Sequence, residues 1–578
     1  MTILNEVPAG DLRPDVCIIG AGPVGIALAL ECERHGLTVV ALEAGGRSEH
    51  DFSLDGGTTR ANIVDPAHHH PLFVTTRSAF GGTSWAWSGN CVPFDPIDFR
   101  ERPHVPNSGW PITPRDVEPY YANAARILNC DQLGPENLTD EAYASCPLST
   151  AQFSLRPKLA LTYRGCIERS RKITVCLNSP VVSVELSDAG DCVNSVVVAA
   201  HEGRRSLHAR HVVIAAGGLR STQLLLQTQR RWPRHFGGVD GPLGRYYMGH
   251  LAGWISAIQF ANSDDAVRFA PLTNGNRPHG QRRFAISEAL QHSKNLLNTA
   301  FWPSNVSLFD PSHCSGLLSA AFLALAMPGI GRWMMPVSQR TASLGPQPRR
   351  FGSHLRNIVN EPHSTVLKAS RALWGRVAHG NGLGDFLQAA NKGSFLLYYH
   401  AEHAPNPSSR VCLTDRTDDL GLPVMRVDLR YSEGDVESVV KSHRALDESL
   451  RVSSQGQLNY LVQDDELAAR VLEQAKDGYH QIGTTRMGSS SRTSVVDSDC
   501  QVHDVRNLHV ASSSVFPTSS QANPTLLATA LAVRLAENIA KKSTISNAVS
   551  AASVTSIVEG LAALLSPHTR RRCPAAGQ

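Results

Sequence analysis

Two side chains far along the sequence have the chemistry needed to take a proton from a hydroxyl group. His480 lies in the run Gly-Tyr-His-Gln-Ile-Gly-Thr-Thr-Arg-Met-Gly, and Asn523 follows 43 positions later in Ser-Gln-Ala-Asn-Pro-Thr. A histidine, with an ordinary pKa of about 6.5, can accept a proton near neutral pH. An asparagine can hold the oxygen without adding charge. Each residue also has a plainer interpretation, since histidines cap turns and Asn-Pro commonly opens a helix.

Three glycines near the start of the chain, Gly20, Gly22 and Gly25, have the spacing Gly-x-Gly-x-x-Gly. The first permits a tight turn, the second lets the backbone approach a pyrophosphate, and the third lets a helix pack closely on a strand. The surrounding pattern is an apolar run at 15–20, helical periodicity at 23–35 and a second apolar run at 38–43. We therefore predict a strand, helix, strand unit whose helix N-terminus holds an anion.

Glu43 ends the second apolar run, 18 positions after Gly25. Its carboxylate can accept hydrogen bonds from the ribose hydroxyls of an adenosine and would repel a 2′-phosphate. This position disfavours NADP and leaves FAD and NAD open.

Further segments point to a sheet that distant parts of the chain revisit. The pair Gly81-Gly82 precedes Thr83-Ser84 and would let the backbone pass close to a flat ligand. Apolar runs at 179–185 and 209–217 predict strands, and the second ends in glycines before a helix at 219–227.

Length, charge and cysteine usage narrow the class of protein. A chain of 578 residues should divide into two or more domains, which we expect to be interleaved. The formal net charge is only +4, and the sequence has no run of Lys and Arg of the kind that binds phosphate backbones, which argues against nucleic acid as a partner. Twelve scattered cysteines form no Cys-x-x-Cys pair, so we expect reduced, mostly buried thiols and no structural zinc. The N-terminus lacks the features of a signal peptide, which makes the cytoplasm the expected compartment.

Two apolar segments and one histidine run allow other roles. Leu317 to Met327 is too short to span a bilayer, and the apolar face at 554–565 fits docking on the protein itself; membrane contact is the minority interpretation of both. The run His68 to His70 has no partner spaced to complete a metal shell, so we expect a solvated or lid loop and no metal site. Tyr398 to His403 fits either a cavity lining or a plain strand.

Taken together, these motifs resemble the glucose–methanol–choline (GMC) oxidoreductases, the FAD-dependent alcohol oxidases and dehydrogenases. The resemblance covers about 15 to 541, is strong at both ends and does not extend to the middle, about 251 to 390. It implies that His480 is the active-site histidine beside the flavin ring and that Asn523 is its partner. It also implies contacts with FAD at Gly81, Gly82, Thr83, Ser84, Val182 (through its backbone to the adenine), Ala216, Gly217 and Ser512.

The sequence departs from the family at two places. Members similar to pyranose oxidase attach the flavin to a histidine just after the paired glycines, but here Ser84 is followed by Trp-Ala-Trp, so no covalent link is expected there. Many members also have Asp where this chain has Ser512, which weakens one contact with the cofactor.

The resulting prediction is an α/β (α+β) protein with a Rossmann-like FAD-binding domain at 13–250 and 475–545, a substrate domain at 251–474 with a mixed or antiparallel sheet, and a tail at 546–578. The predicted reaction is oxidation of a CH–OH group, in a sugar, glycoside or polyol, by proton abstraction and hydride transfer to flavin N5. A sterol or other hydrophobic-alcohol oxidase with an apolar lid at 317–335 is one alternative, and a flavin-binding protein without turnover is another. The alcohol, the electron acceptor (O₂, a quinone or a protein) and the oligomeric state stay open.

Overall fold

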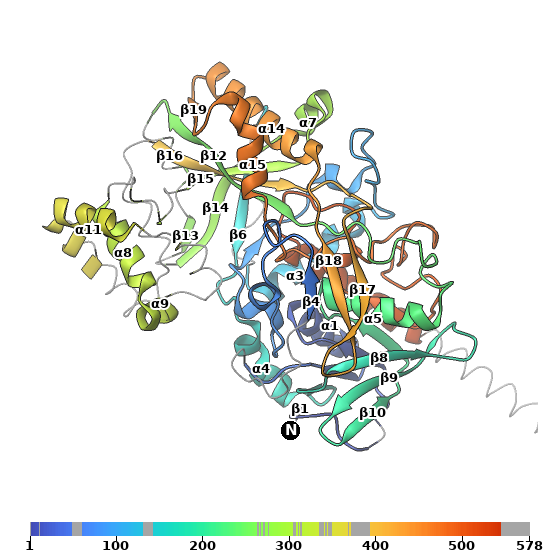
Figure 1. Cartoon of the computed structure of the whole chain (residues 1–578). Coiled ribbons are helices and arrows are strands. Elements are labelled where there is room, and N and C mark those ends of the chain that lie inside the picture. Colours follow the sequence, from blue (N-terminus) through green and yellow to red (C-terminus); the bar gives the residue numbers. More distant parts are fainter. Residues whose placement is uncertain are drawn as a thin grey trace, which may run out of the picture.

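The computed structural model describes most of residues 2–544 (Figure 1). The gaps are residue 11, 49–59, 131–142, 371–393 and single positions or short stretches between 263 and 368. Residues 545–578 lie outside the described part, and with them the apolar face expected at 554–565.

A parallel sheet of six strands holds the glycine-rich turn. Its order is β1-β7-β3-β2-β11-β20, so strands from the beginning, the middle and the end of the sequence lie side by side. The sheet that distant segments revisit is thus confirmed. The strands are β1 (Ile3–Leu4), β2 (Val16–Ile19), β3 (Val39–Leu42), β7 (Ile173–Cys176), β11 (His211–Ile214) and β20 (Leu508–Val510).

Two helices follow strands of this sheet at the carboxyl edge, where α/β proteins bind ligands. Helix α1 (Pro23–Arg34) follows β2, and helix α5 (Gly218–Arg231) follows β11. Both begin at glycine-containing turns where a side chain has no room: a Cβ on Gly25 would meet Gly20 O at the end of β2, and one on Gly218 would meet Gln481. The predicted strand, helix, strand unit is therefore present at the predicted residues.

A larger antiparallel sheet has the order β19-β12-β16-β15-β14-β6-β5, with β13 paired to β14. It takes β5 and β6 from the first part of the chain, while the other strands come from the middle and from 456–460. The division into domains at 250 and 474 stays a prediction. The strands are β5 (Asn90–Cys91), β6 (Leu148–Phe153), β12 (His250–Phe260), β13 (Leu272–Asn274), β14 (Arg277–Ala285), β15 (Thr299–Ser304), β16 (Ser394–Glu402) and β19 (Gly456–Tyr460).

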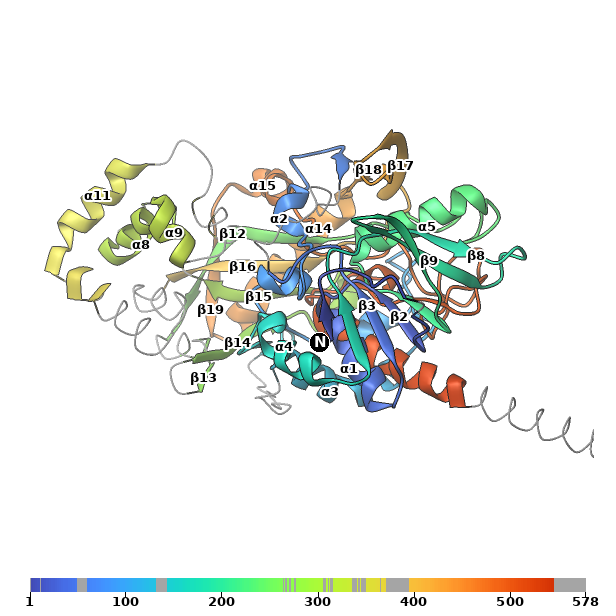
Figure 2. The ribbon, with the colours of Figure 1, turned by 90° about the horizontal axis from the view of Figure 1, so that it is seen from below.

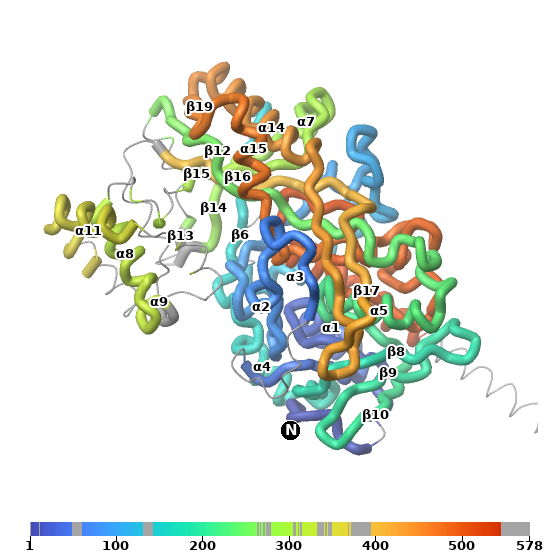
Figure 3. Tube along the Cα trace, viewed as in Figure 1, coloured from blue at the N-terminus to red at the C-terminus, as the bar shows by residue number. Residues whose placement is uncertain are grey.

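Two small sheets flank the parallel one. The antiparallel sheet β10-β9-β8 consists of β8 (Val181–Leu186), β9 (Val193–Ala200) and β10 (Gly203–Leu207). In the other, the hairpin of β17 (Arg410–Thr417) and β18 (Pro423–Asp428) pairs with β4 (Ala61–Ile63), which is far away in sequence (Figure 3).

Apolar side chains form separate cores on the two large sheets. One core fills the parallel sheet and its helices, and another lies between the antiparallel sheet and helices α14 (Glu433–Val452) and α15 (Leu467–Gln474). Of the cysteines in the described part, seven are buried, as expected. The remaining helices are α2 (Leu72–Thr75), α3 (Glu118–Leu128), α4 (Leu159–Arg169), α7 (Glu288–Lys294), α14 (Glu433–Val452), α15 (Leu467–Gln474), one at 525–544, and the 3₁₀ turns η1 (Gly82–Trp85), η2 (Pro96–Phe99), η3 (Pro114–Asp116), η7 (Asp464–Glu466) and η8 (Ser513–Val515).

Three helices form a small unit that projects to one side of the molecule in both views (Figures 1 and 2). They are α8 (Gly316–Ala326), α9 (Pro328–Met334) and α11 (Phe351–Asn360). The unit has its own small core, which includes Leu318, Phe322 and Leu325. In the described part of the chain, no helix combines the length and the apolar character needed to cross a membrane.

Candidate active site

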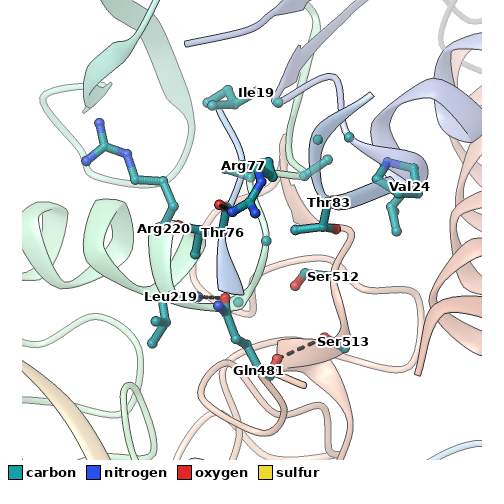
Figure 4. A pocket seen from close by; sticks show the side chains of 18 of the residues that line it. Ile19, Val24, Thr76, Arg77, Thr83, Leu219, Arg220, Gln481, Ser512 and Ser513 are labelled. Carbon is teal, nitrogen blue, oxygen red and sulfur yellow. Dashed lines mark hydrogen bonds between the residues drawn. The ribbon is translucent and has the colours of Figure 1, made fainter. Parts of the chain in front are cut away.

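A long pocket opens along the carboxyl edge of the parallel sheet (Figure 4). Its walls come from the turn between β2 and α1, the end of β3, the start of η1, the start of α5 and the segments at 479–481 and 511–528. The predicted cofactor residues that line it are Gly20, Gly22, Glu43, Gly82, Thr83, Ala216, Gly217 and Ser512. His480 lines the same pocket, so the proposed base and the proposed cofactor site share one space.

The glycines at this pocket let two backbone segments, at Gly22 and at Gly82, approach each other closely. A Cβ on Gly82 would lie 2.8 Å from Gly22 Cα, and Gly82 has a φ of +51°. Gly22 is the N-cap of helix α1 and offers no side chain, and Pro23 lies in the first turn. Its N-terminal end therefore faces the pocket with backbone donors and a positive dipole end, as a pyrophosphate requires.

Glu43 is 5% exposed and holds the loops around it. Its carboxylate accepts hydrogen bonds from Ala21 N at 2.9 Å and Gly45 N at 3.0 Å. Burial raises the pKa of Glu43 to about 7, against the lowering effect of these backbone donors. Two carboxylate oxygens have lone pairs beyond these two bonds, so ribose hydroxyls can still be accepted.

Four predicted cofactor residues are not among those that line the pocket: Gly25, Gly81, Ser84 and Val182. The first three have clear packing roles. A Cβ on Gly25 would lie 2.1 Å from Gly20 O, so Gly25 is required where helix meets strand. Gly81 has a φ of +95°, and its carbonyl accepts from Ser84 Oγ at 2.6 Å. Val182 is replaced in the lining by its neighbour Val181, because successive residues of a strand face opposite sides. The contact of Val182 with an adenine stays a prediction.

Sequence reasoning missed several lining residues. Arg77 and Arg220 reach the pocket from different elements (Figure 4), and burial lowers the pKa of Arg220 to about 10. The Gln481 side chain accepts from Leu219 N at 2.9 Å, and its backbone carbonyl accepts from Ser513 Oγ at 2.8 Å. Gln481 thus links the start of α5 to the segment that carries His480. Its position directly after His480 was the only sign in the sequence that Gln481 belongs to the site.

The structure brings His480 and Asn523 together. The Asn523 Nδ2 atom lies 3.1 Å from His480 Nε2, and the His480 side chain is 19% exposed. Asn523 directly precedes Pro524 and the helix at 525–544, which agrees with the capping interpretation as well. The structure thus places Asn523 both beside His480 and at the start of this helix.

Asp477 fixes the other side of the His480 ring. Its Oδ1 accepts from the backbone nitrogens of Gly478, Tyr479 and His480 at 2.7, 2.8 and 3.2 Å, which forms a tight turn. Its Oδ2 lies 3.1 Å from His480 Nδ1. Burial alone would raise the pKa of Asp477, but His480 and His250 outweigh it and hold that pKa well below its usual range.

His250 at the start of β12 determines which nitrogen of His480 carries the proton. His250 Nε2 donates to Ser519 O at 3.3 Å, and burial lowers the pKa of His250, so its Nδ1 is an acceptor. His480 Nδ1 lies 2.9 Å from that Nδ1 and therefore donates to it and to Asp477. His480 Nε2 is left as an acceptor, which bonds the Asn523 Nδ2 donor in this structure and can take a proton when that amide turns away.

His400 in β16 completes a cluster of three imidazoles. Its ring stacks on His250 with centroids 4.2 Å apart, and its Nδ1 donates to Gln521 O at 2.7 Å. Burial lowers the pKa of His400 well below its ordinary value. The ligand atoms of His250, His400 and His480 lie within 4.8 Å of one another. Neither His250 nor His400 carried a signal in the sequence beyond the strand pattern around His400.

A buried polar network holds the backbone that presents Asn523. Ser520 Oγ donates to Asp98 Oδ2 at 2.6 Å, and Gln521 Nε2 donates to Asp95 Oδ2 at 3.0 Å. Burial, with the neighbouring Asp95 and Glu402, raises the pKa of Asp98 to about 8. Because buried polar groups are costly unless bonded, this network restricts the segment to one conformation.

An ion pair that is fully buried lies in the same network. Arg102 donates to Glu402 at 2.8 Å and 2.5 Å through its two terminal nitrogens, and both side chains are 0% exposed. Glu402 also accepts from Asn298 N at 3.0 Å. Glu402 stands two residues after His400 in β16, so the pair fixes the strand that carries His400.

The expectation of a solvated loop at 68–70 is wrong for His69, which is 1% exposed. Its Nε2 lies 2.9 Å from Tyr247 Oη, and its Nδ1 lies 2.6 Å from His70 O. The backbone of the loop pairs with Asp477, since His70 N donates to Asp477 O at 2.7 Å. The loop therefore supports the turn that carries His480.

Comparison with known proteins agrees with this arrangement. Residues 405–532 match the family described as GMC oxidoreductase. The 2-methyl-1,2-propanediol dehydrogenase of Mycolicibacterium austroafricanum is 22% identical over 92% of this chain and 96% of its own length. The paromamine 6′-oxidase of Streptomyces fradiae is 22% identical over 91% of each chain. The crystal structure of pyridoxine 4-oxidase from Mesorbium loti has the same fold, with a TM-score of 0.51, 15% identity, and coverage of 91% of this chain and 98% of the other. Residues 405–532 thus match the GMC oxidoreductase family, and the similarity to the two named enzymes extends over nine-tenths of the chain.

Proposed function

We propose that this protein is an FAD-dependent enzyme that oxidises a CH–OH group, with His480 as the base and Asn523 as the group that orients the alcohol. The observation that carries the proposal is that His480 lines the dinucleotide pocket while its Nε2 faces Asn523 at 3.1 Å. A base and a neutral amide thus converge at one end of a site suited to a redox cofactor.

The pocket fits FAD. The start of α1 supplies backbone donors for a pyrophosphate, and Glu43 supplies acceptors for a ribose. Gly82 lets its backbone pack against the glycine-rich turn at Gly22. Bound FAD would supply the acceptor for the hydride that leaves the alcohol carbon. Ser512 lines the pocket, but its hydroxyl accepts from Ser514 N at 3.2 Å, which fits the weaker contact expected at this position.

The side chains around His480 prepare it to take a proton. His250 and Asp477 together hold the proton on His480 Nδ1, so Nε2 accepts the hydroxyl proton of the alcohol. The Asn523 amide, which bonds His480 Nε2 at 3.1 Å, can turn its donor to the alcohol oxygen. The carboxylate of Asp477 then stabilises the imidazolium, because an opposite charge at this distance favours the charged form.

A sugar, glycoside or polyol is the proposed substrate class. Three half-buried rings lie next to one another on β12, β16 and β15: Trp254 and Tyr398 have centroids 5.1 Å apart, and Tyr398 and Trp302 4.8 Å. Trp302 is 6.5 Å from His400, so this row of rings reaches the histidine cluster. Aromatic faces suit the C–H faces of a sugar ring, and the names of the two relatives above, a diol dehydrogenase and a paromamine oxidase, support a polyhydroxy substrate.

Product analysis with a panel of sugars, glycosides, polyols and sterols tests the substrate class. A new carbonyl in place of a hydroxyl of one of the polyhydroxy compounds would support the proposal. Turnover of sterols alone would overturn it in favour of a hydrophobic-alcohol oxidase.

Replacement of Gly82 by alanine tests the cofactor site. The new Cβ would lie 2.8 Å from Gly22 Cα at a φ of +51°, so the two backbones must separate. We expect the affinity for FAD to fall about tenfold or more, since a single strained contact of ~1.4 kcal/mol is tenfold in Kd. Titration of the protein with FAD, followed by flavin fluorescence, measures this. Gly434→Ala, where the nearest atom would be Ser432 Oγ at 3.7 Å, is the control, and equal affinities in both variants would contradict the assignment.

Replacement of Asp477 by asparagine tests how His480 is oriented. The amide oxygen of the new side chain can keep the turn, but its NH₂ would then face the donors His250 N and His480 Nδ1. The proton on His480 would then move to Nε2, so that Nε2 could no longer accept the proton of the alcohol. We expect the rate of flavin reduction to fall about tenfold, since losing stabilisation of the imidazolium equal to one pKa unit changes a rate by that factor. Rapid-reaction absorbance measures the rate. Asp497→Asn, in a turn where Oδ1 accepts from Asp499 N at 2.8 Å, should leave it unchanged.

A further inference from the structure

Helix α11 presents apolar side chains to solvent and polar side chains to the interior. Phe351, Leu355 and Val359 are 43%, 53% and 73% exposed, and their spacing of four places them on one face of the helix. His354 and Asn357, on the opposite side, are 0% and 7% exposed. This is the reverse of the arrangement expected for a helix on the surface of a soluble protein.

Hydrogen bonds hold α11 in this orientation. His354 Nδ1 lies 3.1 Å from Ser319 Oγ on α8, and the His354 ring stacks on Phe322 with centroids 4.0 Å apart. The Asn357 amide donates to Pro311 O at 2.8 Å and to Ser319 Oγ at 3.2 Å. A rotation that buried the apolar face would break these bonds and leave Ser319 Oγ and Pro311 O without these donors, which opposes the rotation.

Other exposed apolar side chains gather in the same unit. Of the fifteen large hydrophobic side chains that are exposed in the described part of the chain, seven fall between 327 and 367. Besides the three on α11, they are Met327, Ile330, Val366 and Leu367, which are 53%, 43%, 69% and 52% exposed. We call these seven side chains together the apolar face of the α8–α11 unit. A concentration of exposed apolar side chains in one unit is typical of an interaction surface.

The unit is also basic. The sequence from 308 to 370 has six Lys or Arg residues and only Asp310 and Glu361 as acidic ones, a formal charge of +4 that equals the charge of the whole chain. Arg350 and Arg356 are exposed at the start and in the middle of α11. Two copies of such a surface would repel each other, whereas an anionic surface would attract it.

We propose that the apolar face of the α8–α11 unit docks on an anionic lipid bilayer. The apolar side chains would enter the interface between headgroups and acyl chains, and Arg350 and Arg356 would lie against lipid phosphates. The unit lies on the surface of the bilayer and does not cross it. Leu325 and Phe322 of α8, both 0% exposed, form the core of the unit, so the contact is made by α11 and its neighbours and not by the apolar stretch of α8.

Co-sedimentation of the FAD-loaded protein with vesicles tests the proposal. We expect binding to vesicles of mixed phosphatidylcholine and phosphatidylglycerol, with weaker binding to phosphatidylcholine alone. Val359→Asp and Leu355→Asp, each placing a charge in the acyl region, should lower the partition coefficient about tenfold. The double variant Arg350→Glu and Arg356→Glu should remove the preference for phosphatidylglycerol, because each basic residue near an anionic surface is favourable.

Val239→Asp is the matched control, since Val239 is 71% exposed and lies outside the unit. It should bind vesicles like the unchanged protein. Absence of binding by the unchanged protein, or an equal loss in Val239→Asp and Val359→Asp, would overturn the proposal. A dimer in solution that Val359→Asp dissociates, without vesicle binding, would overturn it in favour of self-association. The flavin spectrum of each variant verifies that the protein is folded, and it does not depend on turnover.

Discussion

His480→Ala should lower the rate of flavin reduction by about 10²–10⁴, the range for loss of a general base, while FAD stays bound. His480 Nε2 faces Asn523 at 3.1 Å, and its Nδ1 is held by Asp477 and His250. In the described structure these contacts leave Nε2 as the acceptor at the end of the dinucleotide pocket. Anaerobic mixing with substrate in a stopped-flow spectrophotometer measures the rate.

The matched control for this variant is His235→Ala. His235 is also partly buried, but its Nε2 donates to Gly190 O at 2.9 Å, and it is not among the residues that line the pocket. Its variant should reduce flavin at the normal rate. A His480→Ala protein that reduces bound flavin within about threefold of the normal rate would remove His480 from the role of base, since such a difference is under about 1 kcal/mol.

Glu402→Ala should lower the free energy of unfolding by about 3–5 kcal/mol, because it leaves the Arg102 guanidinium charged, buried and without its partner. Both side chains are 0% exposed, and the pair has two hydrogen bonds. The variant also removes an acceptor from Asn298 N. Denaturant unfolding of the FAD-loaded protein, followed by tryptophan fluorescence, measures the loss.

A surface pair provides the comparison. Arg60 and Asp419 lie 2.6 Å apart with side chains 47% and 62% exposed, so Asp419→Ala should change stability by less than about 1 kcal/mol. The double change Arg102→Met and Glu402→Leu should recover much of the loss, because it removes both charges. If Glu402→Ala were no more destabilising than Asp419→Ala, the account of a buried network behind Asn523 would be wrong.

The elements that depend on local sequence could be predicted well. The glycines at 20, 22 and 25, the apolar runs beside them and Glu43 lie within one short stretch, and their spacing alone specifies the turn. Strand β11 and helix α5 were predicted for the same reason. Asn523 before the helix at 525–544 is a local signal as well.

The partners of His480 could not be predicted, because they depend on how distant strands pair. His250 is brought to the site by the pairing of β12 with β16, in which it lies opposite Glu402. His400 follows from the same pairing. Asp477 was within reach of sequence reasoning, since an Asp three residues before a histidine, followed by Gly, favours a turn that its own side chain caps.

Burial was the quantity that sequence patterns predicted least well. The run at 68–70 looks hydrophilic, yet His69 is buried because its loop pairs with the backbone of Asp477. Helix α11 has an amphipathic pattern whose polar face, not its apolar one, is turned inward. In both cases hydrogen bonds to distant segments override the preference of the side chain for water or for the core.

The most direct test of the proposed cofactor and reaction is the visible absorption spectrum of the purified protein, recorded before and after anaerobic addition of sugars, glycosides and polyols. The proposed function predicts flavin bands that bleach with at least one of these compounds in the unchanged protein. A protein that stays colourless after incubation with FAD would contradict the cofactor assignment and the reaction built on it. Bound flavin that no alcohol reduces would instead support a flavin-binding protein without turnover.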